Sequence, residues 1–279
     1  MKPLRFRAVF LLALSVFAAL TAVTVRVEAA STEAIPTHPA LNDRIAFEFG
    51  AFYFQTSTQA SLMGPSGGGG VTVDFESALG LEDRSWGGIG GFLWRMSERW
   101  RLEVEYFKLD RSGTRALATE VRWGDTVYPV GTTVTSSYDF SDARIGVGYS
   151  FFKRRDKELG LGLGLHVAGI KTSIQAAGVG ADSADVTAPL PVVSLYGAFA
   201  LTNEWAVRVR ADWLSLNYDA YSGDLRSMAI DVLYQPFRNV GFGLGARNLV
   251  LDLTIDKTEW RGRARTSFAG PTAYMTVSF

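Results

Sequence analysis

The chain has 279 residues, with 28 basic and 28 acidic side chains, 29 glycines, 18 phenylalanines and no cysteine. Without cysteine it can form neither a disulfide framework nor a thiolate metal site, and with two histidines we expect no transition-metal centre and no cofactor. The balanced charge gives no reason to expect nucleic acid as a partner.

The first residues have the features of a secretory signal peptide. Basic side chains precede an uncharged apolar run over residues 8–25, and Val27 and Ala29 supply the small or aliphatic residues of a cleavage site. We therefore expect a signal peptide over residues 1–29 and a polar periplasmic segment over residues 30–42. The alternative is an uncleaved helical anchor, because the run approaches the roughly 20 residues that span a bilayer.

From residue 43 onward, apolar and polar side chains alternate in successive segments, which predicts amphipathic strands. Ten segments show this pattern: 43–55, 86–96, 99–106, 141–151, 159–167, 189–201, 205–213, 228–234, 240–246 and 272–279. Segment 159–167 is the clearest, with leucines on one face and glycines on the other. Two further stretches, 71–81 and 118–130, leave eight or twelve strands as alternatives, since they either add hairpins or fold over the mouth of the structure.

The connections between these segments alternate in length. Short polar turns are expected at residues 97–98, 153–158, 202–204 and 238–239, and longer loops at 56–85, 114–136 and 176–188. Short turns at one end and longer loops at the other are typical of barrels that cross an outer membrane. A closed barrel also satisfies every backbone polar group in lipid. The sequence therefore predicts an all-β fold, a closed antiparallel transmembrane β-barrel of about ten strands over residues 43–279.

Aromatic residues near the strand ends are expected to form the interfacial girdles of such a barrel. They are Tyr53, Trp86, Trp100, Tyr106, Trp205, Trp213, Tyr234 and Tyr274.

The polar strand faces predict a charged lumen. Its expected lining residues are Arg44, Glu48, Arg101, Glu103, Glu105, His166, Arg208, Arg210, Asp212 and Asp231. Charges in a low-dielectric interior must be paired, so we expect an ion-pair network that plugs and rigidifies the barrel. Glycines on the same faces would leave room for the long arginine and glutamate side chains. The alternative is a selectivity lining for a small polar pore.

We expect no catalytic site. Acyl transfer needs a nucleophile with a base beside it. His38 lies in the lead-in segment, where we expect it to be mobile, and His166 points to the lumen with Ala168 as its next neighbour on that face. The lesser alternative is that His166 acts as a catalytic base.

The last strand segment places Ala273, Met275, Val277 and Phe279 on one face. An apolar face that ends in an aromatic ring is typical of the final strand of an outer-membrane barrel. In that reading Met275, Val277 and Phe279 form the signal that the assembly machinery reads.

Several segments together resemble the small outer-membrane β-barrels of proteobacteria, of the OmpA and OmpW type in the wide sense. They are DFESALGLED at 74–83, RWRLEVEYFKLDRSG at 99–113, WGDTVYPVGTTV at 123–134, NVGFGLGARNLVLDL at 239–253 and WRGRARTSFAGPTAYMTVSF at 260–279. The resemblance implies a fold and a location in the outer membrane after export, and it brings no catalytic or ligand residues.

We therefore expect a non-enzymatic integral outer-membrane protein with a structural or limited passive-transport role. Its expected partners are outer-membrane lipids, lipopolysaccharide, the barrel-assembly machinery and, as an option, a small solute. The alternative function is a narrow porin-like channel for small polar or hydrophobic solutes. A lipid-modifying enzyme is the remote alternative.

Overall fold

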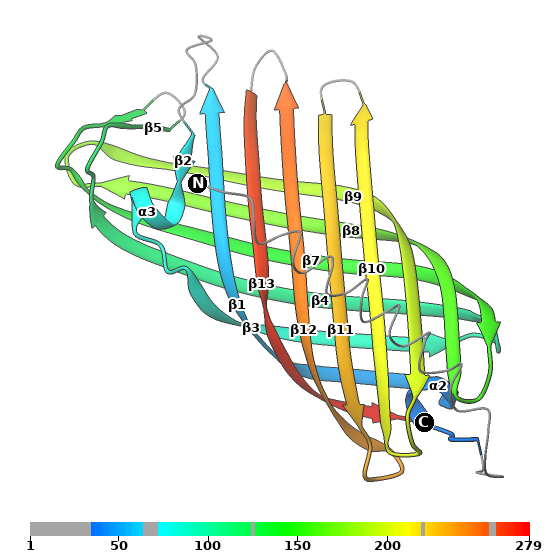
Figure 1. Ribbon diagram of the computed structural model, residues 1–279. Coiled ribbons are helices and arrows are strands. Elements are labelled where there is room, and N and C mark those ends of the chain that lie inside the picture. Colours follow the sequence, from blue (N-terminus) through cyan, green and yellow to red (C-terminus); the bar gives the residue numbers. More distant parts are fainter. Residues whose placement is uncertain (1–34, 64–71, 124–125, 219–220, 257–260) are drawn as a thin grey trace, which may run out of the picture. The chain divides into compact units, whose positions relative to one another are not determined.

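The computed structural model describes residues 35–63, 72–123, 126–218, 221–256 and 261–279. Ten long strands form an antiparallel barrel that closes by pairing of the first strand with the last (Figure 1). They are β1 (Ile45–Met63), β3 (Arg84–Arg95), β4 (Trp100–Ala116), β7 (Thr133–Lys153), β8 (Lys157–Ala176), β9 (Gly180–Ala200), β10 (Trp205–Tyr218), β11 (Tyr221–Tyr234), β12 (Val240–Asp256) and β13 (Arg261–Ser278). The predicted fold class and the count of ten strands are confirmed. The predicted signal peptide lies outside the described residues.

Five short elements of the described part of the chain lie at the two ends of the barrel. At one end are β2 (Val73–Asp74), α3 (Phe75–Leu79) and the hairpin of β5 (Val121–Trp123) and β6 (Thr126–Tyr128), and at the other end is α2 (Pro39–Asn42) (Figure 1). The two stretches that left the strand count open therefore add no barrel strand. Side chains of α3 and of the β5–β6 hairpin pack against inward-facing residues of the barrel wall, so these elements fold over and into its mouth. None of the helices that the structure describes is long and apolar enough to span a membrane.

The short turns lie where the sequence predicts them, but strands extend into the expected long loops. β1 extends to Met63, and β8 and β9 are joined by a turn at residues 177–179 where a loop over 176–188 was expected. The prediction ended these strands too early because the apolar residues change face within them. In β8 the outward-facing residues are apolar up to Val167, whereas beyond that point the apolar residues Ile170 and Ile174 face inward.

This change of face divides the barrel into two halves. In the membrane half, which ends at the short turns, the outward residues are large and apolar, and Phe49, Leu163 and Leu244 are 57%, 71% and 66% exposed. In the extracellular half, outward residues such as Lys171 and Asp185 are polar and exposed. Short turns are periplasmic in outer-membrane barrels, which orients the second half toward the outside of the cell.

Paired aromatic rings mark both borders of the membrane half. Tyr53 and Trp86 lie 4.8 Å apart between ring centroids at the extracellular border, and Trp205 and Tyr234 stack at 4.4 Å at the periplasmic border. Such rings suit the interface between lipid and water. The prediction for Tyr274 is wrong, because this side chain faces the lumen and is 6% exposed. Its neighbours Ala273 and Met275 occupy the outward register instead.

Candidate functional site in the barrel lumen

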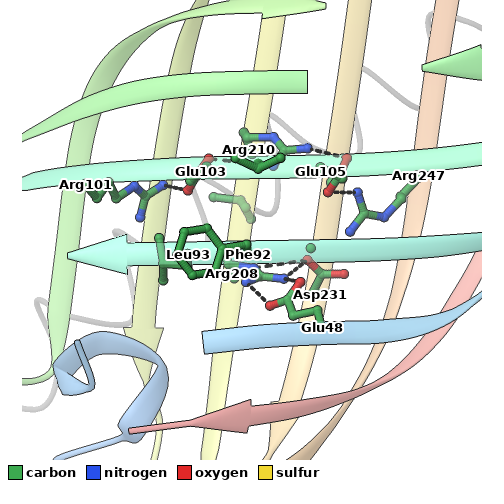
Figure 2. Close-up of a pocket in the computed structure, with 14 residues that line it drawn as sticks. Glu48, Phe92, Leu93, Arg101, Glu103, Glu105, Arg208, Arg210, Asp231 and Arg247 are labelled. Atoms are coloured by element: carbon green, nitrogen blue, oxygen red, sulfur yellow. Dashed lines mark hydrogen bonds and ion pairs between the residues drawn. The ribbon is translucent and has the colours of Figure 1, made fainter. Parts of the chain in front are cut away.

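The membrane half of the lumen is crossed by a layer of paired charges, which we call the charged layer. Its residues come from β1, β4, β7, β8, β10, β11 and β12: Glu48, Arg101, Glu103, Glu105, Asp142, Arg144, His166, Arg208, Arg210, Asp212, Asp231 and Arg247. Figure 2 shows Arg208 with Glu48 and Asp231 as its partners, at N–O distances of 2.6 and 3.2 Å. The structure thus brings together nine of the ten predicted lumen residues and adds Asp142, Arg144 and Arg247.

Several carboxylates of the charged layer pair with arginines on strands that are distant around the barrel. Glu105 of β4 accepts from Arg210 of β10 at 2.9 Å and from Arg247 of β12 at 2.5 Å (Figure 2). Arg144 of β7 donates to Glu103 and to Asp212, each at 3.0 Å. Because burying an unpaired charge is costly, this sharing stabilises the buried charges and ties opposite walls together. A cavity of about 30 Å³ is left between these side chains.

His166 belongs to the charged layer and is 2% exposed. Its Nδ1 lies 2.8 Å from Asp142 Oδ2 and its Nε2 lies 3.7 Å from Asp212 Oδ2. Ser194 donates a hydrogen bond from its hydroxyl to Asp212. A serine, a histidine and carboxylates therefore lie close together in the lumen. However, the Ser194 hydroxyl makes its hydrogen bonds with Asp212 and Arg144 and not with the imidazole of His166. A base must be within hydrogen-bond reach of the nucleophile it activates, and this arrangement does not provide that contact.

The lumenal glycines make room for side chains of two kinds. Charged side chains lie against some of them, as the sequence predicts: a Cβ at Gly91 would come within 3.2 Å of the Glu48 carboxylate, and a Cβ at Gly146 within 3.1 Å of the Arg144 guanidinium. The rings of Tyr196 and Tyr274 lie against glycine strands: a Cβ at Gly160 would overlap the Tyr196 ring, and a Cβ at Gly243 would overlap the Tyr274 ring. The guanidinium of Arg101 then stacks 3.2 Å from the Tyr196 ring centroid. The glycines thus make room for charged side chains, as predicted, and also for tyrosine rings, on which Arg101 and Arg208 pack.

The extracellular half of the lumen holds an apolar cluster that the sequence analysis missed. Phe268 is at its centre and is fully buried, with ring centroids 4.5 Å from Phe140, 6.0 Å from Phe54 and 6.3 Å from Phe107. Ile170, Ile174, Leu190, Leu225, Leu249, Leu251 and Leu253 complete the wall of this cluster. The change of face within each strand is the sequence signal that could have revealed it.

The helix α3 is fixed over this cluster by its own polar residues. Asp74 caps its N-terminus by accepting from the Ser77 N–H at 2.9 Å, and Gly80 ends it in the left-handed conformation, φ 74°. Glu76 accepts from Arg111 Nη1 at 2.6 Å and from the Thr58 N–H at 2.9 Å. These hydrogen bonds join α3 to β4 and β1, so the helix is held in a fixed position at the mouth of the barrel.

The β5–β6 hairpin is anchored in the same mouth by Tyr128. This side chain is fully buried, and its hydroxyl donates to Asp182 Oδ2 of β9 at 3.0 Å. Burial, aided by the Asp182 carboxylate, raises the pKa of Tyr128 to about 12. The phenol therefore stays a hydrogen-bond donor at physiological pH.

At the periplasmic end, α2 closes the barrel. Its residue Leu41 is fully buried against Ala198, Ala206, Leu233 and Tyr274. The Ala40 carbonyl accepts from Arg95 Nη2 at 2.7 Å, and the Leu41 carbonyl accepts from the Lys153 ammonium. Arg95 in turn pairs with buried Glu158 at 2.9 Å. The segment before β1 is therefore tied to the barrel wall.

Two residues at this end differ from the sequence-based expectation. His38 is not mobile: it is fully buried, its Nδ1 accepts from the Ala40 N–H at 3.0 Å, and its Nε2 lies 3.2 Å from the Glu204 carbonyl. Burial lowers the pKa of His38, against the opposing effect of the Glu204 carbonyl and Asp43. Arg44 is exposed and precedes β1, where it lines an open periplasmic cavity of about 590 Å³ outside the charged layer.

The predicted assembly residues lie on the outer face of β13 and at its end. Met275 and Phe279 are 42% and 62% exposed, and Val277 is half-buried. The Phe279 N–H donates to the Ile45 carbonyl at 2.9 Å, so the end of the chain takes part in closure of the barrel. Within the described residues, no three histidine, aspartate or glutamate side chains gather in a form that could hold a metal ion.

No protein-family model matches the chain, and no curated protein sequence matches it. Among solved structures, the outer-membrane protease OmpT from Escherichia coli covers 89% of this chain and 100% of its own, at 11% identity and a TM-score of 0.58. That likeness shows the fold. Together with the closed barrel, its exposed apolar belt and its buried charges, it fixes the class and the location. The chain is an integral outer-membrane β-barrel.

Two further barrels are similar at a lower level. The toluene transporter TodX of P. putida has 10% identity and a TM-score of 0.34 over 88% of this chain and 94% of its own. Ail, the attachment invasion locus protein of Yersinia pestis, has 8% identity and a TM-score of 0.38 over 83% of this chain and 99% of its own. A shared fold does not fix a function, so the function has to be argued from the barrel itself.

Proposed function

We propose that this outer-membrane β-barrel is a closed, non-enzymatic structural protein of the envelope whose lumen does not conduct. The observation that carries the proposal is that three successive layers fill the lumen. From the periplasm outward these are α2 with Leu41, the charged layer, and the apolar cluster around Phe268. We further propose that, among outer-membrane β-barrels, the chain belongs with the small barrels of the OmpA and OmpW type. This proposal rests on the sequence segments quoted above.

Two of these layers block the passage of ions through the lumen for different physical reasons. In the charged layer, side chains from facing walls meet at ion-pair distance, and the cavity between them, about 30 Å³, holds no more than a few waters. The apolar cluster excludes ions because an ion cannot be transferred into an apolar core without a large penalty. Opening one layer would leave the other two in place, so a steady pore would require a concerted rearrangement.

The proposal against an enzyme rests on where the two histidines lie. Both are fully or almost fully buried, and each is engaged by neighbouring polar groups. Neither is placed to reach a substrate from the outer leaflet. In a structural role, the apolar belt contacts outer-membrane lipids and lipopolysaccharide, and the assembly machinery reads Met275, Val277 and Phe279.

Planar-bilayer recording tests the closed lumen. The folded protein, verified by its heat-modifiable mobility on gels, should give no steady conductance. A variant without three members of the charged layer, Glu103→Ala, Arg208→Ala and Arg210→Ala, should also stay silent, because the apolar cluster and α2 still close the bore. Steady, ion-selective currents from the unmodified protein would overturn the proposal in favour of a porin-like channel.

A further inference from the structure

A small apolar cavity lies in the extracellular half, between the barrel walls and the elements that fold into the mouth. Its volume is about 60 Å³, several times the roughly 10–15 Å³ that one water molecule requires. One side is formed by β1, β12 and β13, the other by β7, β8 and β9, and Phe75 of α3 and Trp123 of β5 line it as well. The cavity belongs to neither the charged layer nor the periplasmic end.

The lining favours an aromatic occupant. Phe75 makes edge-to-face contacts with Trp123, at 5.5 Å and 60°, and with Tyr138, at 5.8 Å and 85°. Ile170 and Leu253 add aliphatic surface. A further ring could extend this set of contacts, since aromatic rings prefer edge-to-face and offset arrangements.

Two hydroxyl groups in this lining are the decisive observation. Tyr138 and Thr172 are 2% and 9% exposed, and neither Tyr138 Oη nor Thr172 Oγ1 makes a hydrogen bond of ordinary geometry among the residues that the structure describes, although the Thr266 hydroxyl lies near Tyr138 Oη. They are directly paired across β7 and β8, so both face inward side by side. Buried hydroxyls without partners are uncommon in folded proteins, and a pair of them in an apolar cavity indicates a missing hydrogen-bonding group.

Charge and access narrow the class of ligand. Arg263 lies at the rim, faces outward and pairs with Asp252 at 2.6 Å, and the nearby Arg111 is bonded to Glu76 and Thr58, so these cations already have partners. Inward-facing Ala60 and Ala184 line the cavity and are only partly buried, so the cavity is not fully enclosed.

We propose that this cavity binds a small, uncharged, single-ring aromatic molecule that carries one hydroxyl or carbonyl group, held by Tyr138 and Thr172. The ring packs among Phe75, Trp123 and Leu253, and its polar group occupies the space beside the two hydroxyls. The proposal does not depend on whether the bore conducts, because it rests only on the lining of this cavity, which lies among members of the apolar cluster such as Phe75, Trp123 and Tyr138.

Ligand-observed fluorine NMR tests the site with two probes, 4-fluorophenol and fluorobenzene, on the full-length folded protein in lipid nanodiscs. The variant Ala264→Leu, whose cavity is filled by the larger side chain, gives the signal that arises from partition of each probe into lipid. This signal is subtracted from that of the unmodified protein. We expect saturable binding of 4-fluorophenol, about tenfold tighter than that of fluorobenzene, because the hydroxyl satisfies buried polar groups.

The variant Tyr138→Phe with Thr172→Val removes both hydroxyls and keeps the shape of the lining. It should bind the two probes equally. The matched control is the next cross-strand pair, Ser137→Ala with Ser173→Ala, whose hydroxyls face outward and lie 2.7 Å apart. This control should keep the tenfold preference.

Three results would overturn the proposal. The unmodified protein and Ala264→Leu could give identical signals, which would leave water as the occupant. Fluorobenzene could bind the unmodified protein as tightly as 4-fluorophenol. The variant without hydroxyls could retain the preference. The comparison of the two probes on the unmodified protein remains decisive even if a variant fails to fold.

Discussion

The membrane half and the extracellular half of this barrel use the same strands with opposite polarity. On β8, Leu163 faces outward and is 71% exposed to lipid, whereas eight residues later Lys171 faces outward and its side chain is 68% exposed to water. The inward residues change in the opposite sense, from His166 to Ile174. The hydrogen-bonded register runs on unbroken between these residues. The surrounding solvent, and not the backbone, therefore decides which face of each strand is apolar.

The two halves are consequently stabilised in different ways. In the extracellular half, apolar side chains leave water for the lumen, as in a soluble protein. In the membrane half, apolar side chains stay in lipid, and the lumen is held by ion pairs and by tyrosine rings packed on glycine. Substitutions should reveal this difference, and the predictions below run from the largest effect to the smallest.

The largest loss should follow removal of one partner from the charged layer. Arg144→Ala leaves Asp212 and Glu103 buried with fewer partners, which should lower the free energy of unfolding by about 3–5 kcal/mol. Urea unfolding of the protein in lipid vesicles, followed by tryptophan fluorescence, measures this loss.

The control for that variant is an exposed pair in the extracellular half. Arg122 lies 3.8 Å from Glu120, with both side chains more than half exposed. Arg122→Ala should change the free energy of unfolding by less than about 1 kcal/mol. Equal losses from the two variants would show that the charged layer does not stabilise the membrane half.

A charge placed on the same face of one strand should act differently in the two halves. Leu163→Arg puts a charge in the lipid and should destabilise the barrel by about 2–4 kcal/mol. Gln175→Arg, twelve residues further along the outer face of β8 at an exposed position, should change its stability by no more than about 0.5 kcal/mol. Yield of folded barrel and urea unfolding measure both effects, and similar losses at the two positions would contradict the division into halves.

A methyl group should be tolerated on the lipid face and not in the lumen. Gly160→Ala forces the Tyr196 ring away from the wall and should destabilise the barrel by about 1–3 kcal/mol. At Gly88, a Cβ would meet no atom within 4 Å, so Gly88→Ala should have little effect. Thermal unfolding of both variants makes the comparison, and an equal tolerance would argue against the packing of Tyr196 on glycine.

The smallest effect should be local and dependent on pH. Because the pKa of His38 is lowered in the folded protein, its contribution to stability is present above the unfolded value of 6.5 and is lost as the pH falls through the lower folded value. Protonation removes the acceptor for the Ala40 N–H, a loss of about 1 kcal/mol for a helix cap.

Amide hydrogen exchange at Ala40 and Leu41 should therefore accelerate in acid beyond the intrinsic trend, while the β5–β6 hairpin keeps its protection. His38→Asn keeps an N-cap without a titrating ring and should abolish the effect. If His38→Asn shows the same acid response as the unmodified protein, another group controls α2.

The sequence predicted more of the membrane half than of the extracellular half, for a physical reason. Alternation with glycine and charge on one face predicted the strands, the short turns and nine of the twelve residues of the charged layer, because lipid demands a strict apolar face. Beyond the aromatic girdle the apolar residues lie on the opposite face of each strand. The search for an apolar outer face therefore ended β8 and β9 too early, and it left Ile170 and Ile174, which face inward, outside the predicted strands.

Three further features depend on contacts that no local pattern contains. His38 is held by the Glu204 carbonyl, 166 positions away. Tyr274 lies in the lumen because glycine at position 243, on the neighbouring strand, leaves room for its ring. The cavity beside Tyr138 exists only where α3 and the β5–β6 hairpin fold into the barrel. The sequence gives the composition of these segments, and the closed barrel brings them together.

Site-directed spin labelling along the outer face of β8 tests the reversal of polarity most directly. The sequence has no cysteine, so a single cysteine at Leu161, Leu163, Leu165, Lys171, Ser173 or Gln175 carries the only label. In lipid vesicles, we predict high accessibility to oxygen and low accessibility to a water-soluble nickel chelate at the three leucine positions, and the reverse at the other three. A lipid signature that continues to Gln175, or an aqueous signature at Leu163, would contradict the account.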